Sequence, residues 1–260
     1  MSVKESSSPT ISFSEHQNDG ASHDKNIEQF ESGLMTPIQF NGFPVETFNI
    51  LDRMKKYNVP GVSIALIEQG EISWSKSWGE RKAGNAKVVN PETLFQAASM
   101  SKPVAAFAAL RMVEMGQLSL DDPINNRLTR WQIPENDFTQ KEAVTLRHLL
   151  NHTAGTTVHG FADYPQNEPM PSVVDILKGT NGANSEAVVV DTVPGTQWRY
   201  SGGGTTAVQL AIEEAAGREF SEQLRQLVLE PCGMNNSTFK QPLPENLRSN
   251  IASGHLSNGQ

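Results

Sequence analysis

The sequence predicts an α+β fold, with an antiparallel β-hairpin early in the chain and helices through most of the rest. A β-prone run over Val62–Ile67 and an alternating apolar and polar run over residues 72–78 flank Gln69-Gly70, a pair typical of a tight turn. The stretch Phe95–Gly116 then carries apolar residues at helical spacing, and shorter helical patterns follow it. These observations favour an antiparallel sheet flanked by helices, joined to a mostly helical part.

The first elements are set by composition and by helix signals. Residues 1–42 are rich in Ser, Asn, Asp, Glu and His, which predicts a flexible leader with one short element near Ile27–Phe30. A helix is expected over Phe43–Tyr57, started by Pro44 and broken by Asn58–Gly61. In the hairpin that follows, the first strand is expected to be the more buried, because it is a continuous apolar run.

The helix within Phe95–Gly116 is the central element of the prediction. Pro103 suits its first turn, where a missing N–H costs nothing, and Gly116 suits its end. Its buried face is expected to consist of Val104, Phe107, Ala108 and Met112. Later helices are expected at Thr145–Asn151, Ser172–Lys178, Thr205–Ala216 and Ser221–Leu229.

Composition limits the partners of this chain. Its 260 residues are 37% hydrophobic and 19% charged, as in globular proteins. The net charge of −8 argues against a general nucleic-acid binder. No apolar run approaches the ~20 residues of a membrane span. The first residues lack the apolar core of a signal peptide, so the compartment stays open, with the cytoplasm as the default expectation.

Ser99 and Lys102 are the first candidate catalytic residues. They lie three positions apart at the start of the predicted helix, so their side chains share one face. A serine hydroxyl is a weak nucleophile until a base takes its proton, and a neighbouring lysine amine can assist. The helix N-terminus adds N–H groups that suit a developing oxyanion. Taken alone, the spacing also fits a capping serine beside a solvated lysine.

Other polar residues are better explained without a metal or a cofactor, and neither is predicted. His148 and His152 lie four positions apart, but no glutamate or third ligand accompanies them, so helix capping and packing are favoured. Gly202-Gly203-Gly204 lacks the Lys-Ser/Thr of a phosphate loop and suits a close approach of backbone to a cleft. Cys232 is expected to be a small packed side chain.

Four segments in a fixed order carry a family resemblance. They are S-x-x-K at 99–102, LRHLLNHTAG at 146–155, WRYSGGG at 198–204 and LEPCGMNNSTF at 229–239. With the hairpin before them, the chain resembles the serine β-lactamase-like superfamily, which includes class C β-lactamases, D-alanyl-D-alanine peptidases and β-lactamase-fold esterases. The resemblance implies a two-subdomain hydrolase domain over 43–260, with a helical subdomain at about 117–239 and a sheet that is incomplete in this chain.

The resemblance implies roles for particular residues. Ser99 matches the nucleophile that becomes acylated, and Lys102 matches the lysine that activates it. Tyr200 matches the tyrosine that acts as general base or proton shuttle. Gly202 and Gly203 would line the substrate cleft, and Gly202 stands where many β-lactamases have an asparagine, which favours an esterase or a divergent hydrolase. The implied substrates are small esters or amides, with β-lactams and peptides among them.

The resemblance also sets expectations for the end of the chain. The family's third element, Lys-Thr-Gly or His-x-Gly on a later strand, has no counterpart after Phe239. The chain therefore resembles the front part of a longer protein. Residues 1–260 alone are expected to be inactive, and to self-associate or bind a complementary C-terminal segment. The alternative is a non-catalytic relative that binds a ligand or a partner, which the missing element and Gly202 favour.

Overall fold

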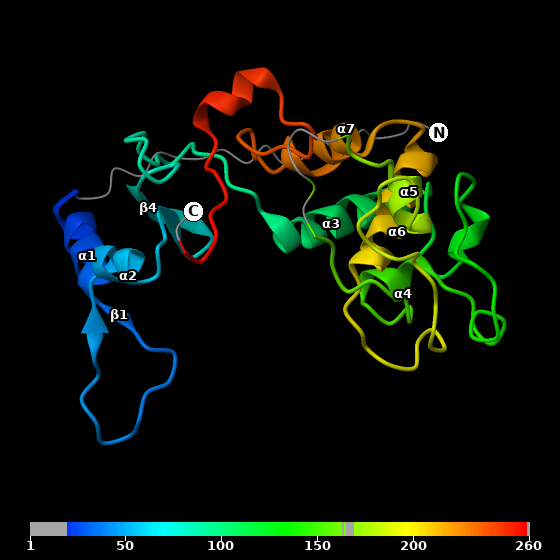
Figure 1. Ribbon diagram of the computed structural model, residues 1–260, viewed down its shortest axis with the longest axis horizontal. Coiled ribbons are helices and arrows are strands. Elements are labelled where there is room, and N and C mark those ends of the chain that lie inside the picture. The colour runs from blue at the N-terminus through cyan, green and yellow to red at the C-terminus, as the bar shows by residue number, and fades with distance from the viewer. Residues whose placement is uncertain (1–19, 163, 165–168, 259–260) are drawn as a thin grey trace, which may run out of the picture. The chain divides into compact units, whose positions relative to one another are not determined.

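The computed structural model describes residues 20–162, 164 and 169–258, which divide into two compact units (Figure 1). The first unit comprises the described residues up to Phe95 and the returning end from Asn250. The second unit runs from Gln96 to Ser249. Helices and antiparallel strands are both present, which confirms the α+β prediction.

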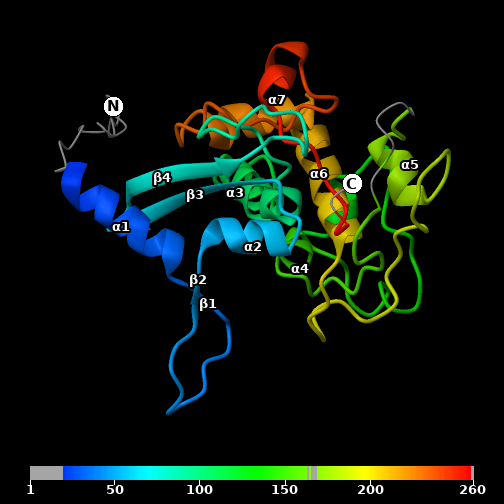
Figure 2. The same cartoon turned by 60° about the vertical axis from the view of Figure 1, so that its left-hand side comes forward.

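The first unit contains the strands. In the described residues its elements are α1 (Gly20–Ser32), β1 (Leu34–Met35), β2 (Thr47–Phe48), α2 (Ile50–Lys56), β3 (Gly61–Glu68) and β4 (Glu71–Gly79). Strand β1 pairs with β2 and β3 pairs with β4, both antiparallel (Figure 2). Gln69 and Gly70 form the turn of the second pair, with φ values of 52° and 87°. Positive φ at both positions is what a tight two-residue hairpin requires, so the predicted hairpin is confirmed.

Helix α1 and strand β1 lie in the stretch that the sequence predicted as a flexible leader, of which residues 1–19 lie outside the described residues. The Phe30 ring centroid lies 5.3 Å from that of Trp74 and 6.2 Å from that of Trp78. Glu31 also accepts a hydrogen bond from Trp78 Nε1 at 2.7 Å. These contacts bury both tryptophans, so β4 is the more buried strand and the opposite prediction was wrong.

Helix α2 is shorter than the predicted Phe43–Tyr57. Its N-cap is Asn49, whose side chain accepts a hydrogen bond from Leu51 N at 2.9 Å. Asparagine is among the strongest N-cap residues, whereas Pro44 only permits a helix start. The chain before the cap is therefore free to form β2.

The second unit is helical. Within its described residues the elements are η1 (Ala98–Met100), α3 (Ser101–Glu114), η2 (Ile124–Asn126), α4 (Leu146–Leu150), α5 (Val173–Lys178), α6 (Gly202–Ala216), α7 (Phe220–Leu224), the π-helical η3 (Arg225–Leu229) and all but the last residue of η4 (Glu245–Asn250). Helix α6 lies at the centre and packs against α3, α4, α5 and α7. The predicted helices are confirmed, although α6 begins at Gly202 rather than Thr205.

The buried face of α3 differs from the predicted one. Its buried residues are Ala105, Ala108, Ala109 and Met112, whereas Phe107 is 67% exposed. The helix is apolar on several sides, so periodicity alone cannot select one stripe. Alanine side chains allow α6 to approach α3 closely, and this packing selects the alanine face. In the described part of the chain, no helix is long and apolar enough to cross a membrane.

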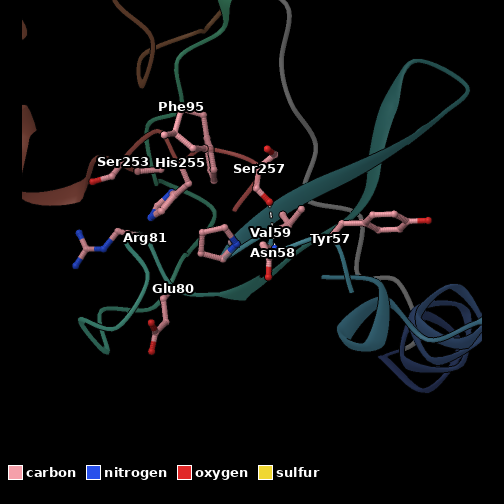
Figure 3. A pocket seen from close by; sticks show the side chains of 13 residues that line it. Tyr57, Asn58, Val59, Glu80, Arg81, Phe95, Ser253, His255 and Ser257 are labelled. Carbon is pink, nitrogen blue, oxygen red and sulfur yellow. Dashed lines mark hydrogen bonds between the residues drawn. The ribbon is translucent and has the colours of Figure 1, made fainter. Parts of the chain in front are cut away.

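A pocket of about 350 Å³ lies within the first unit (Figure 3). One side is formed by residues 252–257, whose hydrogen bonds to the rest of the unit include two that involve side chains. His255 Nε2 accepts from Ala83 N at 3.0 Å, and Asn58 Nδ2 donates to Ser257 O at 3.1 Å. All of the lining residues belong to the first unit, so the pocket does not include the candidate catalytic residues.

Candidate active site

Ser99 lies in the short turn η1, directly before α3. Ala98 ahead of it has a φ of 45°, a left-handed conformation that residues other than glycine rarely adopt. Such a residue costs on the order of 1 kcal/mol and recurs at functional sites. The Ser99 side chain is exposed and Lys102, on the first turn of α3, is half-buried. The nucleophile candidate therefore stands in the turn that leads into a helix.

The side chains of Lys102 and Tyr200 both contact Ser99 Oγ, and all three residues belong to the second unit. Lys102 Nζ donates a hydrogen bond to Ser99 Oγ at 3.0 Å, and the Tyr200 hydroxyl donates another at 2.8 Å. Lys102 Nζ also lies 4.8 Å from the centre of the Tyr200 ring. The structure thus brings together the three residues that the sequence analysis selected, although 101 positions separate Ser99 from Tyr200.

The electrostatic surroundings of Tyr200 favour its ionised form. The Lys102 side chain is the main cause, and the hydrogen bond with Ser99 adds to it, so the pKa of Tyr200 lies below its usual value of 10.0. Partial burial of the phenol opposes this shift. A phenolate that forms nearer to neutral pH is a better general base under physiological conditions than an ordinary tyrosine.

Two histidine rings lie against Tyr200. The His152 ring centroid is 4.6 Å from that of Tyr200, and the His159 centroid is 5.0 Å from it. The sequence analysis assigned His152 to capping or packing and did not select His159. Their contacts with Tyr200 depend on the fold, and the only signal in the sequence was that His152 belongs to the segment LRHLLNHTAG. His148 completes the capping box of α4, as predicted for a capping histidine.

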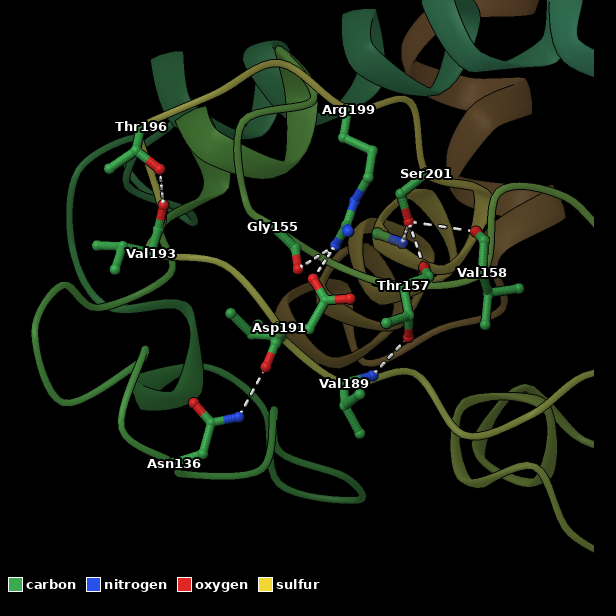
Figure 4. Close-up of polar contacts among 12 residues, drawn as sticks. Asn136, Gly155, Thr157, Val158, Val189, Asp191, Val193, Thr196, Arg199 and Ser201 are labelled. Carbon is green, nitrogen blue, oxygen red and sulfur yellow. Dashed lines mark hydrogen bonds and ion pairs between the residues drawn. The ribbon is translucent and has the colours of Figure 1, made fainter.

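An ion pair holds the backbone just before Tyr200 (Figure 4). The Arg199 guanidinium pairs with Asp191 and donates a hydrogen bond to Gly155 O at 2.6 Å. Asp191 N also donates to Gly155 O, at 3.1 Å. These contacts join the turn after α4 to the segment that leads into α6. The backbone that precedes Tyr200 is therefore held in place by an ion pair and hydrogen bonds.

Ser201 fixes the backbone just after Tyr200 (Figure 4). Its side chain is only 1% exposed, and its hydroxyl donates to Thr157 O at 2.7 Å. The same hydroxyl accepts from Gly204 N at 2.9 Å, which caps α6. A serine at this position therefore satisfies a helix N–H and a loop carbonyl at once.

Gly202 and Gly203, predicted to line the substrate cleft, are buried in the first turn of α6. Gly202 N donates to His159 O and Gly203 N donates to Val158 O, both at 3.0 Å. With Gly204 N bonded to Ser201, this turn has its N–H groups paired within the chain, which agrees with the rejection of a phosphate loop. The two glycines bring residues 158–159 close to Tyr200, and their place in a cleft stays a prediction.

Replacing Gly203 by alanine is expected to destabilise the second unit by about 1–3 kcal/mol, the usual cost of overpacking. A Cβ at this position would lie 2.7 Å from Val188 Cγ2 and 2.9 Å from Thr157 O, so the packing must shift. Urea unfolding measures the change. Gly160→Ala is the matched control, because a Cβ there meets nothing within 4 Å. Equal stability of the two variants would contradict the packing argument.

Two further sequence expectations concern cysteine and metal sites. Cys232 is exposed in the turn after η3, so the prediction of a packed side chain was wrong. The turn places it beyond the last buried helical residue, Leu229, and out of the core. Among the residues that the structure describes, no group of three or more His, Cys, Asp or Glu side chains could hold a metal ion.

Comparison with known proteins gives consistent matches. The family model described as Beta-lactamase matches residues 49–256. Esterase EstB of Burkholderia gladioli is 29% identical over 206 residues, which cover 74% of this chain and 50% of the esterase. The structure of an octameric penicillin-binding protein homologue from Pyrococcus abyssi has a TM-score of 0.65 and 28% identity, and the match covers 80% of this chain and 46% of that one.

A beta-lactamase/D-alanine carboxypeptidase from Yersinia pestis matches in fold, with a TM-score of 0.62 at 22% identity over 77% of this chain and 55% of that one. The chain thus spans about half the length of these relatives. The matches confirm the resemblance drawn from four segments of sequence, and because the family model covers well over half of the residues, this chain belongs to the β-lactamase family.

Proposed function

We propose that the protein is a serine hydrolase that forms an acyl-enzyme on Ser99 with small ester or amide substrates. The convergence of Lys102 Nζ and the Tyr200 hydroxyl on Ser99 Oγ, at 3.0 and 2.8 Å, carries the proposal. A serine hydroxyl held by two groups that exchange protons is an activated nucleophile. The esterase and carboxypeptidase relatives support chemistry at a carbonyl carbon.

In the proposed reaction, one of the pair formed by Lys102 and Tyr200 is first deprotonated, as the Tyr200 phenolate or the neutral Lys102 amine, so that its hydrogen bond reverses and Ser99 becomes the donor. Ser99 Oγ then attacks the carbonyl carbon as its proton passes to that partner. The bond between the carbonyl carbon and the leaving oxygen or nitrogen breaks, and the leaving group takes up a proton from the same pair. Water repeats the sequence on the acyl-enzyme and restores Ser99. Backbone N–H groups at the start of α3 are the candidates to stabilise the oxyanion.

The glycine at position 202 indicates which substrates should be tested first. It has no side-chain amide with which to hold the carbonyl of a β-lactam or a peptide. Simple esters need fewer contacts beyond the reacting carbonyl, so they are the first substrates to test, followed by β-lactams. This order agrees with the 29% identity to an esterase.

Covalent labelling tests the proposal directly. The complete gene product and the 260-residue chain are each incubated with a fluorescent phosphonate and with a fluorescent β-lactam, and the adduct is located by mass spectrometry. We expect the complete protein to carry the phosphonate on Ser99. We expect the 260-residue chain to be unlabelled, because it has no Lys-Thr-Gly or His-x-Gly element after Phe239 to complete the substrate cleft. Folded complete protein that takes up neither probe would favour a non-catalytic relative that binds a ligand or a partner.

A further inference from the structure

We propose that His152 is the positioning residue of Tyr200, holding the phenol beside Ser99 by accepting a hydrogen bond at Nδ1 from the backbone that follows Tyr200. The inference rests on the proposed function, since the position of Tyr200 matters for catalysis only if Ser99 reacts. It also makes a physical claim about Tyr200 that can be measured without substrate.

Three contacts join His152 to three consecutive residues. Arg199 N donates to His152 O at 2.8 Å, and Ser201 N donates to His152 Nδ1 at 3.3 Å. Between these two hydrogen bonds, the His152 ring lies 4.6 Å from the Tyr200 ring, at an interplanar angle of 38°. The backbone is therefore held on both sides of Tyr200, and the ring is supported from one face.

The backbone conformation of His152 makes this double contact available. Its φ is 62°, in the left-handed region, directly after α4. Histidine adopts this region more often than most residues, as asparagine does, and glycine adopts it freely. Asparagine and glycine are therefore the substitutions that test the side chain without straining the chain.

The contact requires a neutral imidazole. A ring that accepts at Nδ1 carries its proton on Nε2, whereas a protonated ring has no acceptor and would repel Ser201 N–H. Burial first, and the charge of Lys102 second, lower the pKa of His152 below its usual 6.5, so the ring is neutral at pH 7. Among the described residues, the titratable and charged groups around it and Tyr200 are Lys102 of α3, Tyr200 itself, the Arg199–Asp191 pair and His159.

The pH dependence follows from the direction of this shift. As the pH falls through the lowered pKa of His152, the ring gains a proton and the hydrogen bond from Ser201 is lost. Tyr200 then loses its support, and a second positive charge appears near Lys102. Catalysis is expected to decline on the acid side for this reason, and to do so less in a variant whose side chain does not titrate.

The test compares His152→Asn with His152→Gly. Asparagine places an acceptor oxygen close to the position of Nδ1, and glycine leaves that position empty. Protein labelled with carbon-13 at tyrosine Cζ reports the pKa of each phenol, and the chain has only three tyrosines. Tyr200→Phe assigns the Tyr200 signal, and the other two signals report whether each variant is folded.

We expect the Tyr200 pKa to lie below 10.0 in the wild type, to stay low in His152→Asn and to rise toward 10.0 in His152→Gly. Ester turnover should fall about tenfold in His152→Gly, the scale of one lost hydrogen bond, and stay within about threefold in His152→Asn. The acid-side decline below pH 6.5 should be weaker in His152→Asn than in the wild type.

Two outcomes would overturn the inference. One is an unchanged Tyr200 pKa in folded His152→Gly. The other applies if that variant does not fold. It is a carbon-13 signal of Tyr200 in the wild type that stays unchanged as the pH is lowered and His152 is protonated. Failure of the proposed function looks different, because the wild type would then lack turnover while the phenol signals still respond to His152.

Discussion

Ser99→Ala is expected to abolish ester hydrolysis by the complete protein, with a loss on the order of 10⁶ in kcat, the scale of removing a serine nucleophile. The substitution removes the atom on which Lys102 and Tyr200 converge, so neither can contribute through it. Residual turnover would come only from substrate binding and oxyanion stabilisation. Release of a chromogenic alcohol, followed under saturating substrate, measures the effect.

Ser101→Ala is the matched control for this experiment. Ser101 begins α3 two positions later, so its substitution perturbs the same helix start without touching the convergent hydrogen bonds. Both variants should melt close to the wild-type temperature, because each removes a single atom, from an exposed side chain at Ser99 and from a half-buried one at Ser101. A Ser99→Ala variant with turnover similar to that of Ser101→Ala would disprove the assignment of the nucleophile.

Local signals were sufficient for much of the fold. The Gln69-Gly70 turn, the cap before α4 and the glycine after α6 each act within a few residues of the chain, so their consequences can be predicted from the sequence. Elements that depend on a partner could not be predicted in the same way. Helix α1 is supported by Phe30 against two tryptophans of β4, and nothing near Phe30 in the sequence reveals those partners.

The same distinction between local signals and contacts made by folding applies to the candidate site. Ser99 and Lys102 are three positions apart at a helix start, so their proximity follows from helix geometry alone. Tyr200 was selected through the resemblance to a family, because no local rule links it to Ser99. His152 was missed as a partner of Tyr200. Its carbonyl oxygen and its Nδ1 accept hydrogen bonds from the backbone N–H groups of Arg199 and Ser201, and these contacts form only when the loop has folded.

Tyr200→Phe is expected to lower kcat by about a hundredfold or more, the usual effect of losing a general acid–base group. The change keeps the ring, with its contacts to His152 and His159, and removes only the hydroxyl that bonds Ser99 Oγ. Because the Lys102 side chain lowers the pKa of this phenol, the loss should be largest near neutral pH, where an ordinary tyrosine would be fully protonated.

The control is Tyr164→Phe, which removes a hydroxyl that accepts a hydrogen bond from Asn184 N at 3.1 Å. Turnover by this variant should match the wild type, because Tyr164 makes none of the described contacts with Ser99 or Lys102. If Tyr200→Phe lost less than about threefold, far below the acid–base scale, the phenol would be a packing residue. Lys102 would then have to move the Ser99 proton alone, since its Nζ makes the remaining hydrogen bond to Ser99 Oγ among the described residues.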